Sequence, residues 1–209
     1  NDAVSTSDID SVDRIQNAID LGVDKIKFGS NITGKVTILQ KEGVNLVIDG
    51  DGYNFDGVIT VNGDARANGA ETLTFKNINF VHTDSDSHDF IWADDAKTLG
   101  FRYAHDVTVD NCTFTGNGMF DNENAVTGIR YRQTSDMVVK NSTFTNMYGA
   151  MWATGCNGIE IENVTITNSK NGISLGTSFN VVIKNSNIDA DAYGIRANGK
   201  GAYDLTVEN

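Results

Sequence analysis

The sequence predicts an all-β fold, a parallel β-helix of about six to seven coils with three short strands in each coil. Two observations support this prediction. The 209 residues include 24 Asn and 21 Gly but no Pro, and good helix formers are scarce, so an all-α fold is excluded. In addition, one short pattern recurs along the chain with a spacing that settles near 22 residues.

The recurring pattern is a pair of apolar residues at alternate positions, then Asn, then a second alternating pair. The Asn residues of the successive copies are Asn77, Asn111, Asn141, Asn163, Asn185 and Asn209, and Gly50 takes the same place in a fainter first copy. Alternation points the apolar side chains into the coil, with Phe80, Phe114 and Phe144 in one interior column. We expect each Asn at a bend between strands, in left-handed backbone and hydrogen-bonded to the Asn of the next coil.

A second strand in each coil is marked by Gly. Its copies begin at Gly100, Gly128, Gly149, Gly172 and Gly194. Alignment of the copies on Gly predicts one outward row and one inward aromatic stack. The outward row is Arg102, Arg130, Met151, Ser174 and Arg196, and the stack is Tyr103, Tyr131 and Trp152.

These repeats resemble those of the pectate-lyase-like superfamily over residues 44–209. The resemblance implies that the β-helix is right-handed, single-stranded and built with an asparagine ladder. Because the chain stops in mid-coil at Asn209, we expect it to be part of a larger protein.

Residues 1–43 are predicted to form an N-terminal cap and a first irregular coil. A helix is expected over about 8–20, with Ser7 as its N-cap and an apolar face that includes Ile15 and Ile19. Members of the superfamily plug the first coil with such a helix, which covers exposed strand edges.

Function is expected where coils carry extra length, and the longest insertion covers residues 81–99. It lies beside an arginine cluster, on the strand face where the resembled enzymes hold substrate. The candidate ligand-binding residues are Arg102, Arg130, Arg132, Arg196, Trp92, Asp94 and Asp95. Arginine binds carboxylates through two hydrogen bonds, so uronic-acid sugars are conceivable ligands. The alternative is that these arginines only offset nearby acids on a solvated face.

Catalysis is the second possibility for this face. By residue type, Lys97, Arg102, Arg130 and His105 could each act as a base. However, the two arginines flanking a proline that the resemblance would imply for a pectate lyase cannot occur here, and the polygalacturonase motifs are not matched.

Calcium is the one cofactor considered. Asp84, Asp86 and Asp89 place carboxylate oxygen ligands at intervals along the insertion. The segment, however, lacks the Gly and terminal Glu of an EF-hand loop. A solvated acidic loop is the alternative.

The net charge of −12 argues against a nucleic-acid partner. No apolar run is long enough for membrane insertion, and mostly polar outer positions predict a monomer. Cys112 and Cys156 lie two coils apart, so both are expected to be free thiols. The sequence therefore favours an extracellular or cell-surface domain of a bacterial protein, acting as a non-catalytic adhesive or glycan-contacting module. The alternative is a polysaccharide lyase or hydrolase acting on uronic-acid-containing glycans.

Overall fold

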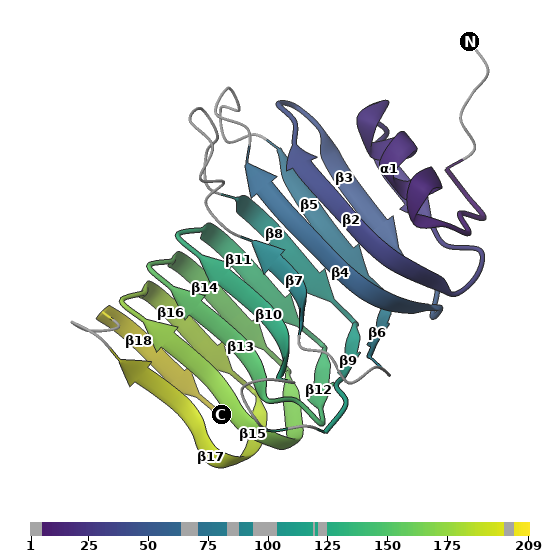
Figure 1. Cartoon of the computed structure of the whole chain (residues 1–209). Helices are drawn as coiled ribbons and strands as arrows, with labels where there is room; N and C mark the ends of the chain where they lie inside the picture. The colour runs from purple at the N-terminus through teal and green to yellow at the C-terminus, as the bar shows by residue number, and fades with distance from the viewer. Residues whose placement is uncertain are drawn as a thin grey trace.

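The computed structural model describes residues 6–63, 71–82, 88–93, 104–118, 120 and 125–198, together with 203–209. These residues form a parallel β-solenoid of about seven turns with one short helix at its N-terminal end (Figure 1). The elements are α1 (Val12–Asp20), β1 (Lys25–Lys27), β2 (Ile32–Gln40), β3 (Asn45–Asp49), β4 (Asn54–Gly63), β5 (Thr72–Lys76), β6 (Asn79–Val81), β7 (His88–Ala93), β8 (His105–Asp110), β9 (Thr113–Thr115), β10 (Val126–Arg132), β11 (Ser135–Lys140), β12 (Thr143–Thr145), β13 (Gly149–Thr154), β14 (Asn157–Glu162), β15 (Thr165–Gly176), β16 (Phe179–Lys184), β17 (Asn187–Asn198) and β18 (Tyr203–Glu208).

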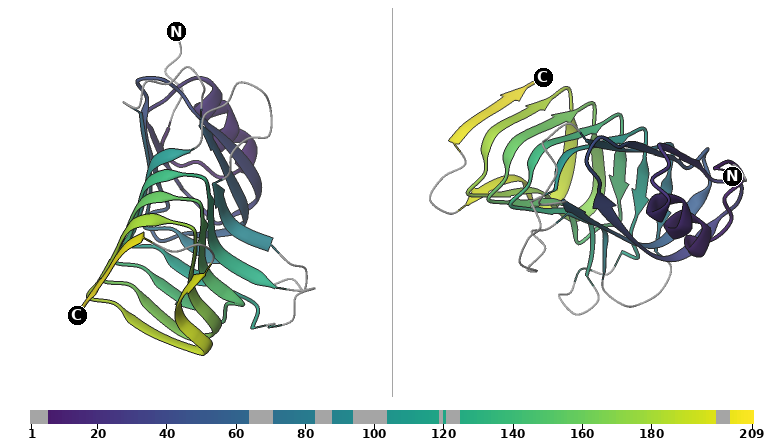
Figure 2. Two further views of the ribbon diagram at one scale, coloured as in Figure 1. Left: turned by 90° about the vertical axis from the view of Figure 1, so that its left-hand side faces the viewer. Right: turned by 90° about the horizontal axis from the view of Figure 1, so that it is seen from above.

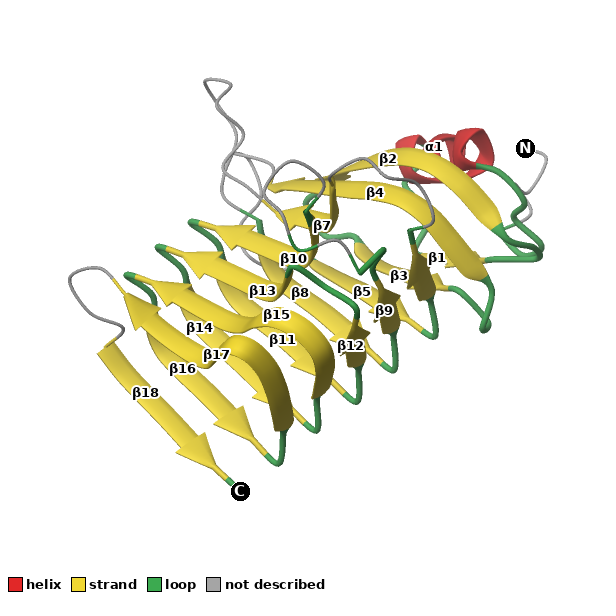
Figure 3. Cartoon of the chain, turned by 60° about the horizontal axis from the view of Figure 1, so that its bottom comes forward, coloured by secondary structure: helices red, strands yellow, loops and turns green. Residues whose placement is uncertain are grey.

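The strands form two parallel sheets. The first sheet has the order β1-β3-β5-β8-β11-β14-β16-β18, one strand from each turn. The second sheet contains the other two segments of each turn. These are separate strands in the middle of the chain, as in β12 and β13, whereas β15 bends and pairs with both of them. The predicted three strand segments per coil are thereby confirmed, and the stacked turns are visible in Figures 2 and 3.

Aromatic side chains fill the centre of the solenoid. Phe80, Phe114 and Phe144 are fully buried and stack face to face, with centroid separations of 4.6 and 4.5 Å. Each pair lies on neighbouring strands in register, so the ring spacing follows the strand spacing of the sheet. The predicted phenylalanine column is confirmed.

The asparagine ladder is present, but some of its links run through aspartate. Asn111 donates to Asn77 at 2.7 Å, and Asn163 donates to Asn141 at 2.8 Å. Asn141, however, donates to Asp110 Oδ1 at 2.8 Å rather than to Asn111. The predicted left-handed backbone holds at all of these Asn residues, with φ between 51° and 54°.

A second, shorter asparagine pair was not predicted. Asn146 and Asn168 both have positive φ at the bend between the short and long segments of the second sheet. The Asn168 amide donates to Asn146 Oδ1. Asparagine therefore serves two different bends of the coil.

The outer face of the first sheet carries one charged residue per turn at a single register position. In order along the solenoid these residues are Lys27, Asp49, Lys76, Asp110, Lys140, Glu162, Lys184 and Glu208. Their signs alternate without exception, and ion pairs form at several steps, such as Lys76 to Asp49 at 3.0 Å. We call these eight residues the charge ladder.

Helix α1 begins later than predicted. Its N-cap is Ser11 rather than Ser7, because Asp8 has left-handed backbone and Ile9 pairs with Phe28 as a β-bridge. Ile15 and Ile19 are buried as expected. At the helix C-terminus, Lys41 Nζ donates to the carbonyls of Ile19 and Asp20 at 3.0 and 2.9 Å, which satisfies groups that a helix end leaves open.

The predicted alignment on Gly is wrong at Gly149. Gly149 pairs with Thr127 and not with Gly128, so Trp152 lies beside Arg130, and Met151 lies beside Ile129. A shift of one residue moves every side chain to the other face of the strand. Met151 is therefore buried, and Trp152 belongs to the outward row instead of the interior stack.

The strand that pairs with β10 on the preceding turn also differs from the prediction. β7, which the sequence placed within the insertion, occupies this position and pairs with both β4 and β10. The segment at Gly100–Tyr103, predicted to be that strand, lies outside the described residues.

The remaining predictions concern the thiols and the membrane. Cys112 and Cys156 are both buried and free, as predicted. Burial raises the pKa of the Cys112 thiol to about 12. In the part of the chain that is described, no helix has the length and apolar character needed to cross a bilayer.

Candidate functional site

An outward row on the second sheet combines two tryptophans with one arginine. Trp92 on β7, Arg130 on β10 and Trp152 on β13 occupy the same register position on three neighbouring turns. The guanidinium carbon of Arg130 lies 5.4 Å from the centroid of Trp92 and 4.7 Å from that of Trp152. Both indoles therefore attract the cation and fix its position. We call these three residues the Trp–Arg row.

The guanidinium also has an acidic partner. Asp89 Oδ1 lies 3.2 Å from Arg130 Nε, and the Asp89 side chain is 9% exposed. Burial raises the pKa of the Asp89 carboxyl, although Arg130 and a hydrogen bond from Thr127 oppose the rise. The Arg130 side chain itself remains one-third exposed. The exposed third of the Arg130 side chain is the part that a ligand could contact.

A third aromatic residue, Tyr148, borders the Trp–Arg row and was not singled out from the sequence. Tyr148 packs edge-on against Trp152 with the ring centroids 5.8 Å apart. Lys170 Nζ lies 5.2 Å from the centroid of Tyr148 and donates to the carbonyl of Phe120 at 2.9 Å. The position of Tyr148, two residues after Asn146 in the repeat, is the signal that could have placed it there.

The other predicted ligand-binding residues are only partly brought together. Arg196 shares the register of the Trp–Arg row but is separated from Trp152 by Ser174, and it lies over Tyr193 instead. Arg132 is exposed at the end of β10, two residues beyond Arg130. Several candidates lie outside the described residues, namely Asp84, Asp86, Asp94, Asp95, Lys97 and Arg102.

His105, a predicted base, lies at the start of β8 on the first sheet and is buried. Its Nε2 is 2.8 Å from Glu71 Oε1, and its Nδ1 is 2.9 Å from Asp106 Oδ2. The Gln40 side chain accepts a hydrogen bond from the backbone N–H of His105 and donates one to the backbone carbonyl of His105. Both ring nitrogens thus face carboxylates, and the ring is fixed between them.

Metal ligands were predicted at Asp84, Asp86 and Asp89. Asp89, the one member of this set in the described structure, is the partner of Arg130. Over the described ranges, no group of three or more His, Cys, Asp or Glu side chains is arranged to hold a metal ion.

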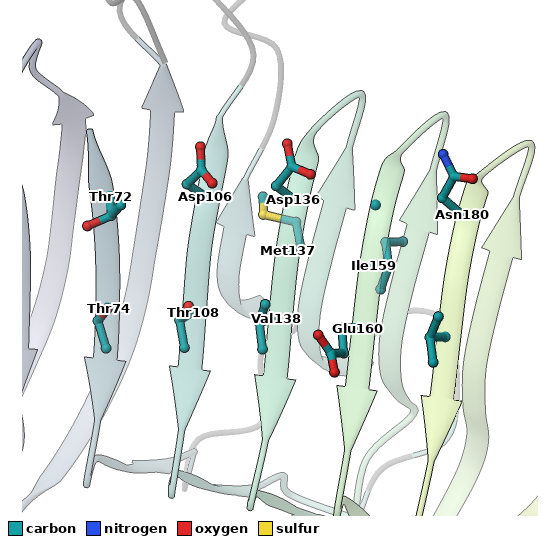
Figure 4. Close-up of a pocket in the computed structure, with 12 residues that line it drawn as sticks. Thr72, Thr74, Asp106, Thr108, Asp136, Met137, Val138, Ile159, Glu160 and Asn180 are labelled. Atoms are coloured by element: carbon teal, nitrogen blue, oxygen red, sulfur yellow. The ribbon is translucent and has the colours of Figure 1, made fainter. Parts of the chain in front are cut away.

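The first sheet carries a second candidate site, which the sequence reasoning missed. A groove of about 480 Å³ crosses its outer face over β5, β8, β11, β14 and β16 (Figure 4). The lining residues are Thr72, Thr74, Asp106, Thr108, Asp136, Met137, Val138, Gly158, Ile159, Glu160, Asn180 and Val182. We call this feature the outer groove.

One wall of the outer groove is a column of residues with left-handed backbone. Asp106, Asp136, Gly158 and Asn180 have φ of 48°, 54°, 76° and 51°, and each lies at or near the start of a strand. Asp and Asn tolerate this conformation better than most side chains do. Figure 4 shows the side chains of Asp106, Asp136 and Asn180 in one row across the sheet. Each member precedes a ladder Asn by five residues, which is the sequence signal for the column.

Comparison with known proteins gave one family and one similar structure to describe. The family model described as right handed beta helix region matches residues 56–209. A similar fold occurs in the crystal structure of a putative glycosyl hydrolase from Parabacteroides merdae. The two sequences are 12% identical, and the TM-score is 0.44. The alignment covers 98% of this chain and 90% of that chain. No curated protein matches the sequence.

Proposed function

The chain belongs to the right-handed β-helix family, and we propose that it is a glycan-contacting domain of a secreted or cell-surface bacterial protein, with the Trp–Arg row as its contact surface. The observation that carries the proposal is the placement of Trp92, Arg130 and Trp152 on three successive turns at one register position. An extended ligand that runs along the solenoid would meet all three side chains in succession.

The chemistry of the row suits sugars. Indole rings offer apolar surface to the C–H faces of a pyranose, and their rigid shape costs little entropy to order. Arg130 offers N–H groups that can bind two hydroxyls or one carboxylate in a fixed plane. Since Trp92, Trp152 and Asp89 already hold the guanidinium, binding would require little further ordering of Arg130.

Titration of the domain with oligosaccharides tests this proposal. Oligogalacturonate, alginate and glycosaminoglycan fragments supply carboxylates, and cello-oligosaccharides supply a neutral comparison. We expect Arg130→Lys to weaken the best ligand about tenfold or more, because hydrogen bonds to charged groups contribute about 1.5–3 kcal/mol. Lysine retains a cation beside the buried Asp89, so the fold should be preserved.

Arg14→Lys is the matched control, since Arg14 lies on helix α1 and its guanidinium pairs with Asp10. It should leave the affinity unchanged. Equal losses in the two variants, or binding to none of these glycans, would contradict the proposal. The same samples should be followed for absorbance from new double bonds, with and without Ca²⁺. A signal abolished by Arg130→Ala would instead identify a lyase.

A further inference from the structure

The outer groove is separate from the Trp–Arg row, because the two features lie on different sheets of the solenoid. It runs across five neighbouring strands and therefore along the solenoid axis (Figure 4). With parallel strands about 4.8 Å apart, a groove of this kind accepts an extended chain rather than a compact molecule.

The lining of the groove is acidic. It contains the carboxylates of Asp106, Asp136 and Glu160 and neither Lys nor Arg. The Asp106 carboxylate contacts the His105 ring, and Glu160 forms an ion pair with Lys184 at 2.7 Å. Asp136 is exposed, and among the described residues no cation pairs with it. The whole chain adds a net charge of −12. A cationic ligand is thus attracted at long range and meets an unneutralised carboxylate in the groove.

A glycine adjoins that carboxylate. Gly158 occupies the position on the next turn where the other members of the column carry Asp or Asn. A Cβ at Gly158 would lie only 2.7 Å from Asp136 Oδ1, so the Asp136 carboxylate lies over this glycine. The absence of a side chain at Gly158 therefore permits this position of the Asp136 carboxylate, and a larger residue would displace it.

The floor of the groove presents hydroxyl and methyl groups. Thr74, Thr108, Val138, Glu160 and Val182 share one register position. All but Glu160 are β-branched and have few rotamers. Threonine hydroxyls can bind sugar hydroxyls, and the methyl groups contact the ring. The wall residues Asp106 and Asp136 recur one strand apart, about 4.8 Å, which is close to the length of one pyranose unit. Successive sugar units of an extended glycan would therefore lie over successive strands.

From these observations we propose that the outer groove binds a cationic glycan, an oligosaccharide of amino sugars in which a free ammonium group pairs with Asp136. This site is additional to the Trp–Arg row and does not depend on it.

The experiment compares a glucosamine hexamer with its fully N-acetylated counterpart by calorimetry on the whole chain. We expect the glucosamine hexamer to bind and the acetylated hexamer, which carries no charge, to bind far more weakly. Asp136→Asn should weaken binding about threefold or more, the effect of one exposed ion pair. Gly158→Asn should weaken binding by displacing the Asp136 carboxylate, while Asn tolerates the left-handed backbone as Asn180 does.

Glu162→Gln is the matched control, because it removes the same charge from the outer face of the same sheet without lining the groove. Equal weakening by Glu162→Gln and Asp136→Asn would reveal diffuse attraction only and would overturn the proposal. Equal binding of the acetylated hexamer, or preference for a basic hexapeptide, would overturn it as well. Arg130→Lys should leave this binding unchanged, so failure of one site is distinguishable from failure of the other.

Discussion

Single residues with left-handed backbone determine where the coils bend. Of the fifteen non-glycine residues with positive φ in the described structure, thirteen are Asn or Asp. Their short side chains tolerate this conformation and also bond to the neighbouring turn, as Asn163 does to Asn141. The abundance of asparagine in the composition therefore has a local cause at each bend.

Asn141 should be among the residues most sensitive to substitution. It accepts from Asn163, donates to Asp110 and has φ of 52°. We expect Asn141→Ala to lower the free energy of unfolding by about 2–4 kcal/mol, from left-handed strain and two lost hydrogen bonds. Urea denaturation measures this. Asn187→Ala, at an exposed strand position, is the control, and equal effects of the two substitutions would contradict the argument.

Asp89 should make stability depend on pH. Its folded-state pKa is raised above the ordinary value of 3.8 by burial. A raised pKa means that the folded state favours the protonated carboxyl, so this contribution is full below about pH 3.8 and is lost as pH rises through the raised pKa. The stability of the native protein relative to Asp89→Asn should therefore fall over that interval. A difference that stays constant from pH 3 to 7 in chemical denaturation would refute this account.

At the scale of strands, the charge ladder reinforces the register of the first sheet. Each Lys faces an acid on every neighbouring turn of the sheet, as Lys140 does with Asp110 and Glu162. Cross-strand pairs of opposite charge stabilise a sheet modestly, and like charges oppose it.

Lys140→Glu would place three acids on successive turns. We expect a loss of about 1–2 kcal/mol relative to Lys140→Gln, because the neutral Gln repels neither neighbouring acid, whereas Glu faces a like charge at two steps. The loss should shrink in 1 M NaCl, where the screening length is about 3 Å. Urea denaturation at low and high salt tests this, and a loss that is insensitive to salt would show that side-chain packing and not charge is responsible.

Alternation of apolar residues was sufficient to predict the strands but not every register. At Gly149–Trp152, both Met151 and Trp152 are apolar enough to be interior residues, and only the pairing with β10 decides between them. In that register Trp152 lies outward, and the cation of Arg130 covers one of its faces. The position of β7 was missed for a similar reason, since extra residues on both sides of it obscured the repeat.

At the scale of the whole molecule, the sequence predicted the solenoid and named two residues of one of the two candidate sites. Arg130 and Trp92 were recognised because arginine and tryptophan stand out beside an insertion. The outer groove was not recognised, since Asp106 and Asp136 are ordinary turn residues until stacking of the turns brings them side by side. Sites of this kind arise between turns, so no single copy of the repeat contains them.

The alternating charge ladder also constrains how such a protein can lengthen. Duplication of one turn would place two residues of the same sign next to each other, whereas duplication of two turns would restore the alternation. Lengthening in pairs of turns is therefore the electrostatically neutral route, for natural duplication and for engineered extension alike. The smallest unit that can be copied without an electrostatic cost is twice as long as the repeat visible in the sequence.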